Sequence, residues 1–212
     1  MTRGKFLVIE GGDGAGKSTS AHLLCDTLVD LGYPTVYTRE PGGTPLGESL
    51  RTFTFATKLP SDLDVCLMYS ARVLHLHHMI EPTLSQGVNV VCDRYTTSTW
   101  AYQLEIPGVR KGVPSSVLHR MEDALYMSGM PMPDLEFFFS VPLDIALSRT
   151  GLRGETPDRF EATLESTSWA YAFRYSEFHP PYPVHTVDAV PSPEIIQHSL
   201  LQSILPLLQP SS

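Results

Sequence analysis

The sequence predicts an α/β fold in which a parallel β-sheet carries helices on its faces. Two observations carry this prediction. Short apolar runs alternate with segments of helical periodicity from one end of the chain to the other. The chain has 212 residues, of which 42% are hydrophobic, and this is enough for one domain with a well-buried core. We therefore expect a single domain over residues 1–212, and we exclude a disordered chain, a collagen and a multi-domain array.

The first third of the sequence predicts two strands with a helix between them. Residues 5–10 (KFLVIE) form a continuous apolar run that is typical of a buried strand, and residues 35–38 (TVYT) form the second. Between these runs, Gly32 is a helix stop signal. Three leucines recur before it at helical spacing: Leu24, Leu28 and Leu31. The predicted order of elements in this part of the chain is therefore strand, glycine loop, helix and strand.

A longer helix is predicted next. Ser61 and Asp64 have the spacing of a capping box, so we expect this helix to begin at Ser61. It should continue to about Ile80 and break or kink at Pro82, because proline removes a backbone donor. Three of its residues lie near one face by their spacing: Val65, Met68 and Arg72.

The second half predicts three more strands, over residues 88–94 (VNVVCDR), 135–141 (LEFFFSV) and 184–189 (VHTVDA). The helix after the second of these should start at Pro142, since proline suits a first helical turn. A C-terminal helix should open at Pro193 for the same reason.

The composition limits the partners and the compartment. The formal charge of −8 argues against nucleic-acid binding, because a phosphate-tracking surface needs excess Lys and Arg. No apolar run approaches the roughly 18 residues that cross a bilayer, and the N-terminal sequence has no signal-peptide core. The three cysteines form no C-x-x-C pair, which predicts reduced, mostly buried thiols: Cys25, Cys66 and Cys92. We expect a cytoplasmic protein without membrane or nucleic-acid partners.

A nucleotide-binding motif lies between the first strand and the first helix. Residues 11–18 (GGDGAGKS) fit G-x-x-x-x-G-K-[ST] in the strand-to-helix context that this motif requires. Its glycines let backbone N–H groups turn toward an anion, and the helix N-terminus adds partial positive charge. Lys17 can then bridge the outer phosphates and Ser18 can bind Mg²⁺.

A second chemical feature follows the third predicted strand. Asp93 comes at the end of a buried run, so its carboxylate should lie at the same sheet edge as the glycine loop and hold Mg²⁺ directly or through water. Arg94 would then direct a guanidinium at the phosphates. Taken alone, an Asp-Arg pair after a strand is equally compatible with a surface ion pair.

At this point the chain resembles the thymidylate kinase family. The resemblance is carried, in order over nearly the whole chain, by four segments: GGDGAGKST (11–19), TREPGGT (38–44), DRYTTSTWAYQ (93–103) and DRFE (158–161). It implies a P-loop NTPase fold with a five-stranded parallel sheet. It also implies a homodimeric transferase that moves the γ-phosphoryl group of ATP to dTMP with Mg²⁺.

The resemblance implies two sets of binding residues. On the ATP side these are Gly11, Gly12, Asp13, Gly14, Ala15, Gly16, Lys17, Ser18, Thr19 and Arg149, with Ser18 and Asp93 holding Mg²⁺. On the dTMP side they are Asp13, Arg39, Glu40, Pro41, Arg51, Met68, Arg72, Arg94, Tyr95, Ser98, Thr99, Tyr102 and Gln103.

Individual roles on the dTMP side are also implied by the resemblance. Arg39, with the turn Glu40-Pro41 and a cis proline, would anchor the acceptor phosphate. Arg72 would hydrogen-bond the base at O4, and a solvated helix residue is its alternative. Asp13 would bind the 3′-hydroxyl, while Tyr102 would crowd a ribose 2′-hydroxyl or, alternatively, pack in the core.

A lid is expected over about residues 148–160. Arg149 and Arg153 are four residues apart on one helical face, and a Gly- and Pro-containing loop follows. Some family members carry a basic residue inside the P-loop and others supply it from the lid. Since the P-loop position here is Gly14, the resemblance implies the bacterial-like arrangement, with Lys17, Arg94 and Arg153 as catalytic residues. A solvated charged helix is the alternative for the two lid arginines.

The expected reaction needs no general base. The acceptor is a phosphate monoester that is already largely dianionic near neutral pH, since its second pKa is about 6. Positioning and charge neutralisation suffice.

One position departs from the family. Met68 stands where members usually carry a phenylalanine that stacks on thymine, and methionine gives a less rigid platform. We hypothesise a pocket that accepts other 5-substituted dUMP analogues.

Two other functions remain open. A deoxynucleoside kinase would need a carboxylate base near the sugar, and Asp13 is poorly placed for that role. A P-loop regulatory module would hydrolyse nucleotide to drive a partner, yet the sequence has neither an N-K-x-D-like base reader nor an L-S-G-G-Q signature. His75 and His78 share a helix face, but a metal site there is the weaker interpretation.

Overall fold

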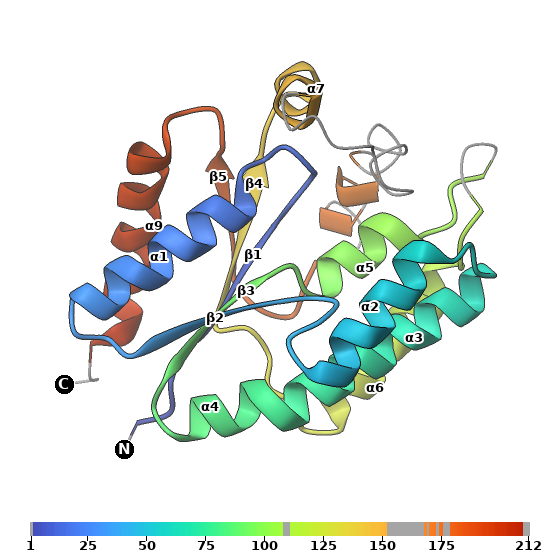
Figure 1. The fold of residues 1–212 in the computed structure, drawn as a ribbon, viewed down its shortest axis with the longest axis horizontal. Coiled ribbons are helices and arrows are strands. Elements are labelled where there is room, and N and C mark those ends of the chain that lie inside the picture. Colours follow the sequence, from blue (N-terminus) through green and yellow to red (C-terminus); the bar gives the residue numbers. More distant parts are fainter. Residues whose placement is uncertain are drawn as a thin grey trace.

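The computed structural model describes residues 2–107, 111–151, 168, 170–172, 174–175 and 179–209. Its centre is a sheet of five parallel strands in the order β2-β3-β1-β4-β5 (Figure 1). The strands are β1 (Phe6–Gly11), β2 (Thr35–Arg39), β3 (Asn89–Asp93), β4 (Leu135–Ser140) and β5 (Val184–Asp188). The predicted α/β fold and its five strands are confirmed.

The helices lie on both faces of this sheet (Figure 1). They are α1 (Lys17–Asp30), α2 (Pro45–Ala56), α3 (Ser61–His75), α4 (Glu81–Ser85), α5 (Thr96–Gln103), α6 (Ser115–Met127), α7 (Leu143–Gly151) and α9 (Pro193–Leu208). Helices α1 and α9 cover one face, while α4, α5 and α6 lie on the other. In the described part of the chain, no helix combines the length and the apolar character that a bilayer crossing requires.

The central strand β1 places apolar side chains on both faces of the sheet. Its side chains alternate, so Leu7 and Ile9 pack under α1 and α9, whereas Phe6 and Val8 pack against the opposite helices. All four side chains are fully buried. The burial of these apolar side chains on both faces fixes the register of β1, and with it the position at which the glycine loop leaves the sheet.

Helix α2 was not predicted. Thr44 accepts a hydrogen bond from the Gly47 N–H at 3.0 Å, and Pro45 occupies the first turn, so the helix has a regular N-terminal cap. Its interior contains Gly47, Thr52 and Thr54, which weaken the periodic signal. The omission matters because α2 forms one wall of the site described below.

The helix that follows begins at Ser61, as predicted, but without the predicted capping box. Ser61 is not the cap: Pro60 is, without a side-chain hydrogen bond, and the Asp64 carboxylate accepts instead from Gln103 at 3.2 Å. The irregularity also begins before Pro82, because residues Leu76–Ile80 form a π-helical segment, η1, between α3 and α4. Since Pro82 has no N–H to give to the carbonyl four residues earlier, the wider turn is a physical response to it.

The cysteine prediction holds for two of three residues. Cys25 and Cys92 are buried and Cys66 is exposed, and all three are free thiols. Cys66 lies on the outer side of α3, where no core element covers it.

Candidate active site

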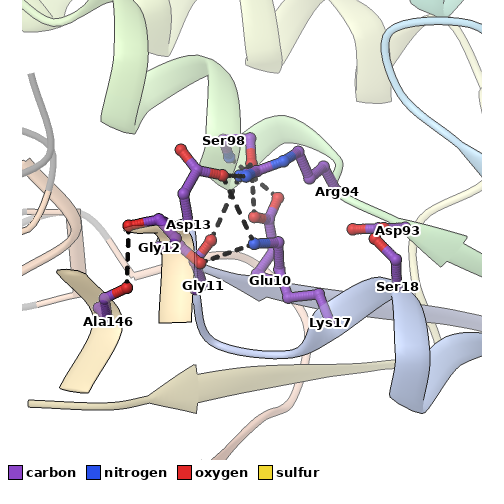
Figure 2. A network of polar contacts seen from close by, with 12 residues as sticks. Glu10, Gly11, Gly12, Asp13, Lys17, Ser18, Asp93, Arg94, Ser98 and Ala146 are labelled. Carbon is purple, nitrogen blue, oxygen red and sulfur yellow. Dashed lines mark hydrogen bonds and ion pairs between the residues drawn. The ribbon is translucent and has the colours of Figure 1, made fainter. Parts of the chain in front are cut away.

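Three strand ends meet at one edge of the sheet. Strand β1 ends at Gly11, β2 at Arg39 and β3 at Asp93, and in the register Asp93 lies opposite both Ile9 and Arg39. In parallel α/β sheets this carboxyl edge is where ligands bind. The glycine loop, residues 11–16, begins at this edge and leads into α1 (Figure 2).

The glycine loop uses left-handed backbone at Gly14 and Gly16, with φ of 82° and 85°. Gly14 is also the point of closest approach to α7, because a Cβ at this position would lie 2.4 Å from the Ala146 carbonyl oxygen. No side chain fits there. The loop therefore presents backbone N–H groups at the N-terminus of α1, which is the arrangement that binds phosphate.

Lys17 lies folded against the glycine loop. Its ammonium donates to the Gly12 carbonyl at 2.7 Å and lies 4.0 Å from Asp13, and its side chain is 6% exposed. Burial, followed by the positive charge of Arg94, lowers the pKa of Lys17 to about 8. An anion in the loop would relieve both effects.

Ser18 and Asp93, the two predicted Mg²⁺ ligands, are in direct contact. The Ser18 hydroxyl donates to Oδ2 of Asp93, while Oδ1 of Asp93 is buried without a hydrogen-bond partner among the described residues (Figure 2). A carboxylate oxygen and a hydroxyl are hard oxygen donors of the kind Mg²⁺ prefers. The free oxygen and the donor set together fit a magnesium ion or one of its waters.

Arg94 connects the glycine loop to helix α5. Its guanidinium pairs with Asp13 and donates to the Gly11 carbonyl at 3.2 Å and to Ser98 Oγ at 3.1 Å (Figure 2). Its backbone has φ of 74°, a conformation that is uncommon for a residue other than glycine. Burial alone would lower its pKa, but the neighbouring Tyr102 and Asp13 raise it above the ordinary value. The guanidinium is thus held permanently charged between the two parts of the site.

Glu10 supports Arg94 and was not predicted as a site residue. Its Oε1 accepts from the backbone N–H groups of Tyr95 and Ser98 at 2.6 and 2.9 Å, and its Oε2 accepts from the Ser98 hydroxyl at 2.7 Å. These N–H groups belong to the first turn of α5, so the carboxylate caps that helix. Its signal in the sequence is a charged residue that ends a buried strand, the same signal that identified Asp93.

A cavity opens beside the glycine loop. It is lined by Asp13, Glu40, Pro41, Arg51, Phe55, Met68, Arg72, Arg94, Tyr95, Ser98, Thr99, Tyr102 and Gln103. Every predicted dTMP-side residue except Arg39 is in this lining. Phe55 lines the cavity in addition, and it lies on α2, the helix that the sequence analysis missed.

Arg72 forms the inner end of the cavity. Its Nε donates to Glu40 at 2.6 Å and its Nη2 to Thr99 at 3.0 Å, while the rings of Tyr69 and Tyr95 lie about 5 Å from the guanidinium carbon. Burial would lower its pKa, but Glu40 raises it above the ordinary value. Nη1 is buried without a partner in the described structure, so one donor of a fixed guanidinium remains available to a ligand.

Arg39 was expected at the acceptor phosphate, and Arg51 was expected on the dTMP side without an assigned role. Arg39 is half exposed and pairs with Glu48 at 3.0 Å, outside the lining. Arg51 lines the cavity, donates to the Pro41 carbonyl at 3.2 Å, and lies over the ring of Phe55 at 4.3 Å. Burial and then the charge of Arg39 lower the pKa of Arg51, and an anion would relieve this repulsion. The Glu40–Pro41 peptide bond is cis, as expected.

Asp13 and Tyr102 meet at the sugar side of the predicted site. The Tyr102 hydroxyl donates to Oδ2 of Asp13 at 2.7 Å, and the Arg94 guanidinium lies 5.1 Å from the Tyr102 ring. Both residues line the cavity, so the structure brings together the two side chains that were expected at the sugar.

The described part of the lid reaches the glycine loop. Arg149, near the end of α7, donates to the carbonyls of Ala189 at 2.8 Å, Val190 at 3.1 Å and Gly14 at 3.4 Å. Thr19, in the first turn of α1, is exposed. Arg153 lies outside the described residues, as do residues 152–167 in general.

The histidines do not form a metal site. His75 is fully buried, whereas His77 and His78 are exposed. Within the described ranges, no three His, Cys, Asp or Glu side chains cluster as metal ligands would.

The thymidylate kinase family model matches residues 9–200 of this chain. The thymidylate kinase of Bordetella petrii is 43% identical over 182 residues, which cover 84% of this chain and 84% of the relative. The thymidylate kinase of Chromohalobacter salexigens is 38% identical over 208 residues and covers 94% of each chain. That of Pseudomonas putida is 36% identical over 210 residues, covering 96% of this chain and 95% of its own. The match spans both the glycine loop and the cavity walls.

Proposed function

We propose that this chain, which belongs to the thymidylate kinase family, phosphorylates dTMP to dTDP with ATP as the phosphoryl donor and Mg²⁺ as the metal. The proposal rests on one observation above the others. The cavity is lined by Arg72, whose Nη1 lacks a partner among the described residues, by Asp13 of the P-loop, and by Arg94, which contacts the loop. Two anions can therefore be bound side by side.

The glycine loop and Lys17 would hold the β- and γ-phosphates of ATP. The loop supplies backbone N–H groups, and Lys17 would exchange its bond to the Gly12 carbonyl for one to phosphate oxygen. Ser18 and Asp93 would hold Mg²⁺, which would supply positive charge to the phosphates. Arg149 lies where it can close the nucleotide side, because it already contacts Gly14 and the turn after β5.

The cavity would hold dTMP with its base at Arg72 and its phosphate at the entrance. Arg72 Nη1 would donate to O4 of thymine, and Thr99, Tyr95 and Gln103 would surround the ring. Asp13 and Tyr102 would contact the sugar, where the tyrosine leaves no room for a 2′-hydroxyl. Arg51 and Arg94 would bind the phosphate, joined by Arg39 once it leaves Glu48.

The chemical step then depends on charge and geometry. The dianionic acceptor needs no proton removed, so no carboxylate has to act as a base. Arg94 would neutralise both phosphates, and Arg153 would close over them from the lid, about residues 148–160. We place this machinery in one nucleoside-monophosphate kinase domain, residues 1–212, of a cytoplasmic enzyme.

A panel of nucleoside monophosphates with Mg-ATP tests the function. We expect ADP release to be fastest with dTMP. Turnover of thymidine but not dTMP would instead identify a deoxynucleoside kinase, and slow ATP hydrolysis unaffected by dTMP would identify a regulatory module. Binding of adenine nucleotide without binding of any pyrimidine monophosphate would overturn the proposal.

We also propose a homodimer through α3 and α6. Leu63, Val73 and Val117 are exposed on these helices, and a hollow beside them is lined by Ser61, Asp62, Val65, Cys66, Gly112, Val113, Pro114, Val117 and Met121. Sedimentation equilibrium should give twice the chain mass of 23.5 kDa. Val117→Glu should halve it, since a charge would be buried in the interface.

A further inference from the structure

His75 is a fully buried polar residue to which the proposed function gives no role. It is the last residue of α3, one turn after Arg72. Its Nδ1 lies 3.2 Å from Oε1 of Glu40 and its Nε2 lies 2.7 Å from Oγ1 of Thr38 on strand β2. The imidazole thus joins the sheet to the turn that follows it.

The partners of the ring define its hydrogen bonds. A carboxylate only accepts, so Nδ1 must donate to Glu40. Nε2 forms the second hydrogen bond of the ring, with the Thr38 hydroxyl. Hydrogen bonds therefore link Thr38 through His75 to Glu40, and Glu40 in turn accepts from Arg72.

Glu40 has one donor on each carboxylate oxygen. Its Oε2 accepts from Arg72 Nε at 2.6 Å and its Oε1 from His75, and the side chain is 3% exposed. Burial alone would raise the pKa of Glu40, but Arg72 and His75 lower it below the ordinary value. A buried carboxylate that loses one of its donors must turn toward another or take up water, and the Arg72 guanidinium would turn with it.

Gly43 makes a second, independent contact with the ring. A Cβ on Gly43 would lie 2.1 Å from His75 Nε2, so the imidazole packs directly on the backbone of this residue. Gly43 belongs to the same turn as Glu40 and Pro41, which both line the cavity. The ring is therefore fixed from two sides and cannot move without moving the turn.

We infer that His75 is a positioning residue for base recognition: through Glu40 it fixes the plane of Arg72, so that Nη1 meets a carbonyl oxygen at position 4 of a pyrimidine. The inference rests on the proposed function. A cytosine base presents an amino group at this position, and a rigid guanidinium donor rejects it because two donors would face each other. A guanidinium that can rotate would no longer exclude cytosine.

Three substitutions separate positioning from packing. His75→Leu keeps an apolar side chain of similar size and removes both hydrogen bonds. The amide nitrogen of asparagine is bonded to Cγ, as Nδ1 of histidine is, so His75→Asn restores a donor to Glu40. The longer side chain in His75→Gln can reach Thr38 but cannot place a donor at the position of Nδ1. His77→Leu is the matched control, because His77 is an exposed histidine two residues along the same segment.

We expect His75→Leu and His75→Gln to raise KM for dTMP about tenfold and to lower the ratio of kcat/KM for dTMP over dCMP, with KM for ATP unchanged. His75→Asn and His77→Leu should stay close to the wild type. In the Glu40→Gln variant, the additional substitution His75→Leu should change neither KM for dTMP nor the ratio of kcat/KM for dTMP over dCMP any further. The melting temperature of each variant is recorded alongside.

The outcomes are distinguishable. Equal loss in His75→Asn and His75→Gln, or a lowered melting temperature with an unchanged dTMP to dCMP ratio, would reduce His75 to a packing residue and overturn the inference. If His75→Leu does not fold, the comparison of Asn with Gln still decides. Failure of the wild type to phosphorylate dTMP would instead refute the proposed function, and the same variants would then be compared by calorimetry for dTMP and dCMP binding.

Discussion

At the scale of single residues, the site is built from ionic groups that have partners before any ligand arrives. Arg94 pairs with Asp13, Arg39 with Glu48 and Lys17 with a loop carbonyl. Each of these contacts is one that a phosphate or a sugar hydroxyl could replace. Arg72 differs, because its Nη1 already lacks a partner in the described structure. The base end is therefore preorganised, whereas the phosphate ends exchange partners on binding.

Lys17 should make nucleotide binding depend on pH. Its pKa of about 8 lies below the ordinary value of 10.5, so the free enzyme loses this charge as pH rises through about 8. ATP favours the charged form. We therefore expect affinity for Mg-ATP to fall between about pH 7 and about pH 9, and binding at about pH 8 to take up roughly half a proton. Calorimetry in buffers of different ionisation enthalpy measures this uptake.

The control is Lys17→Met, measured at saturating nucleotide, which should take up no proton at the same pH. Affinity that stays constant across this pH range in the wild type would contradict the assignment of the charge to Lys17.

Met68 should widen the base pocket. It lines the cavity together with Phe55 and is 8% exposed. A flexible thioether holds a base less rigidly than an aromatic ring, whose stacking contributes about 0.5–1.5 kcal/mol. Met68→Phe should therefore raise the ratio of kcat/KM for dTMP over dUMP by about threefold to tenfold, and it should likewise disfavour 5-hydroxymethyl-dUMP.

The matched control is Met127→Phe, since Met127 is 87% exposed on α6. A wild type that already prefers dTMP as sharply as Met68→Phe would end the idea of a tolerant pocket.

At the scale of elements, two glycines of the P-loop, Gly14 and Gly16, should respond differently to the same substitution. Gly14 and Gly16 both have φ near +80°, so alanine strains both by about 1–2 kcal/mol. Only at Gly14 would the new Cβ meet backbone, at Ala146 in α7; at Gly16 nothing lies within 4 Å. Gly14→Ala should therefore lower the melting temperature and the affinity for ATP more than Gly16→Ala does.

Each of the two variants is the control for the other, because alanine strains the backbone at both positions. Equal losses of stability in thermal unfolding would show that the contact with α7 does not constrain the loop.

The elements also show what the sequence could and could not reveal. The three inner strands, β1, β3 and β4, were predictable because buried apolar runs at a sheet interior leave little choice of structure. Helix α2 carries the signal Thr44-Pro45, equivalent to the Ser192-Pro193 pair that identified α9, but the glycine and threonines in its interior hide it. Phe55 was missed with α2. The register of the π-helical segment depends on packing, which no local pattern contains.

Within the site, the resemblance supplied most cavity residues, and the supporting residues were missed. Glu10 acts on a helix that begins 86 positions later and His75 on a turn 35 positions earlier. Such partners meet only after the sheet has formed, since their contacts run between elements. Glu10 could have been found from the strand-end charge that identified Asp93. His75 offered no comparable signal, since its spacing from His78 suggested only a weakly supported metal site.

At the scale of the whole molecule, strand order places the two anion sites and the lid around one edge. The central strand β1 delivers the P-loop, β3 delivers Asp93 and Arg94 on one side, and β4 leads into α7 on the other (Figure 1). Arg149 ties the end of α7 to the P-loop carbonyl of Gly14 and to the turn after β5.

This arrangement leads to a prediction for the lid. Because Gly14 has no room for a side chain, the P-loop cannot supply its own cation at that position, and the extra positive charge must come from elsewhere. We expect it from Arg153. Arg153→Ala should lower kcat about a thousandfold, as removal of an arginine that stabilises a transferring phosphoryl group does, while KM for dTMP changes little because the cavity lining is intact. Arg120→Ala is the control, since Arg120 is exposed on α6. A fall in kcat of less than tenfold in Arg153→Ala would contradict this role for Arg153. Arg94 and Lys17 alone would then have to neutralise both phosphates.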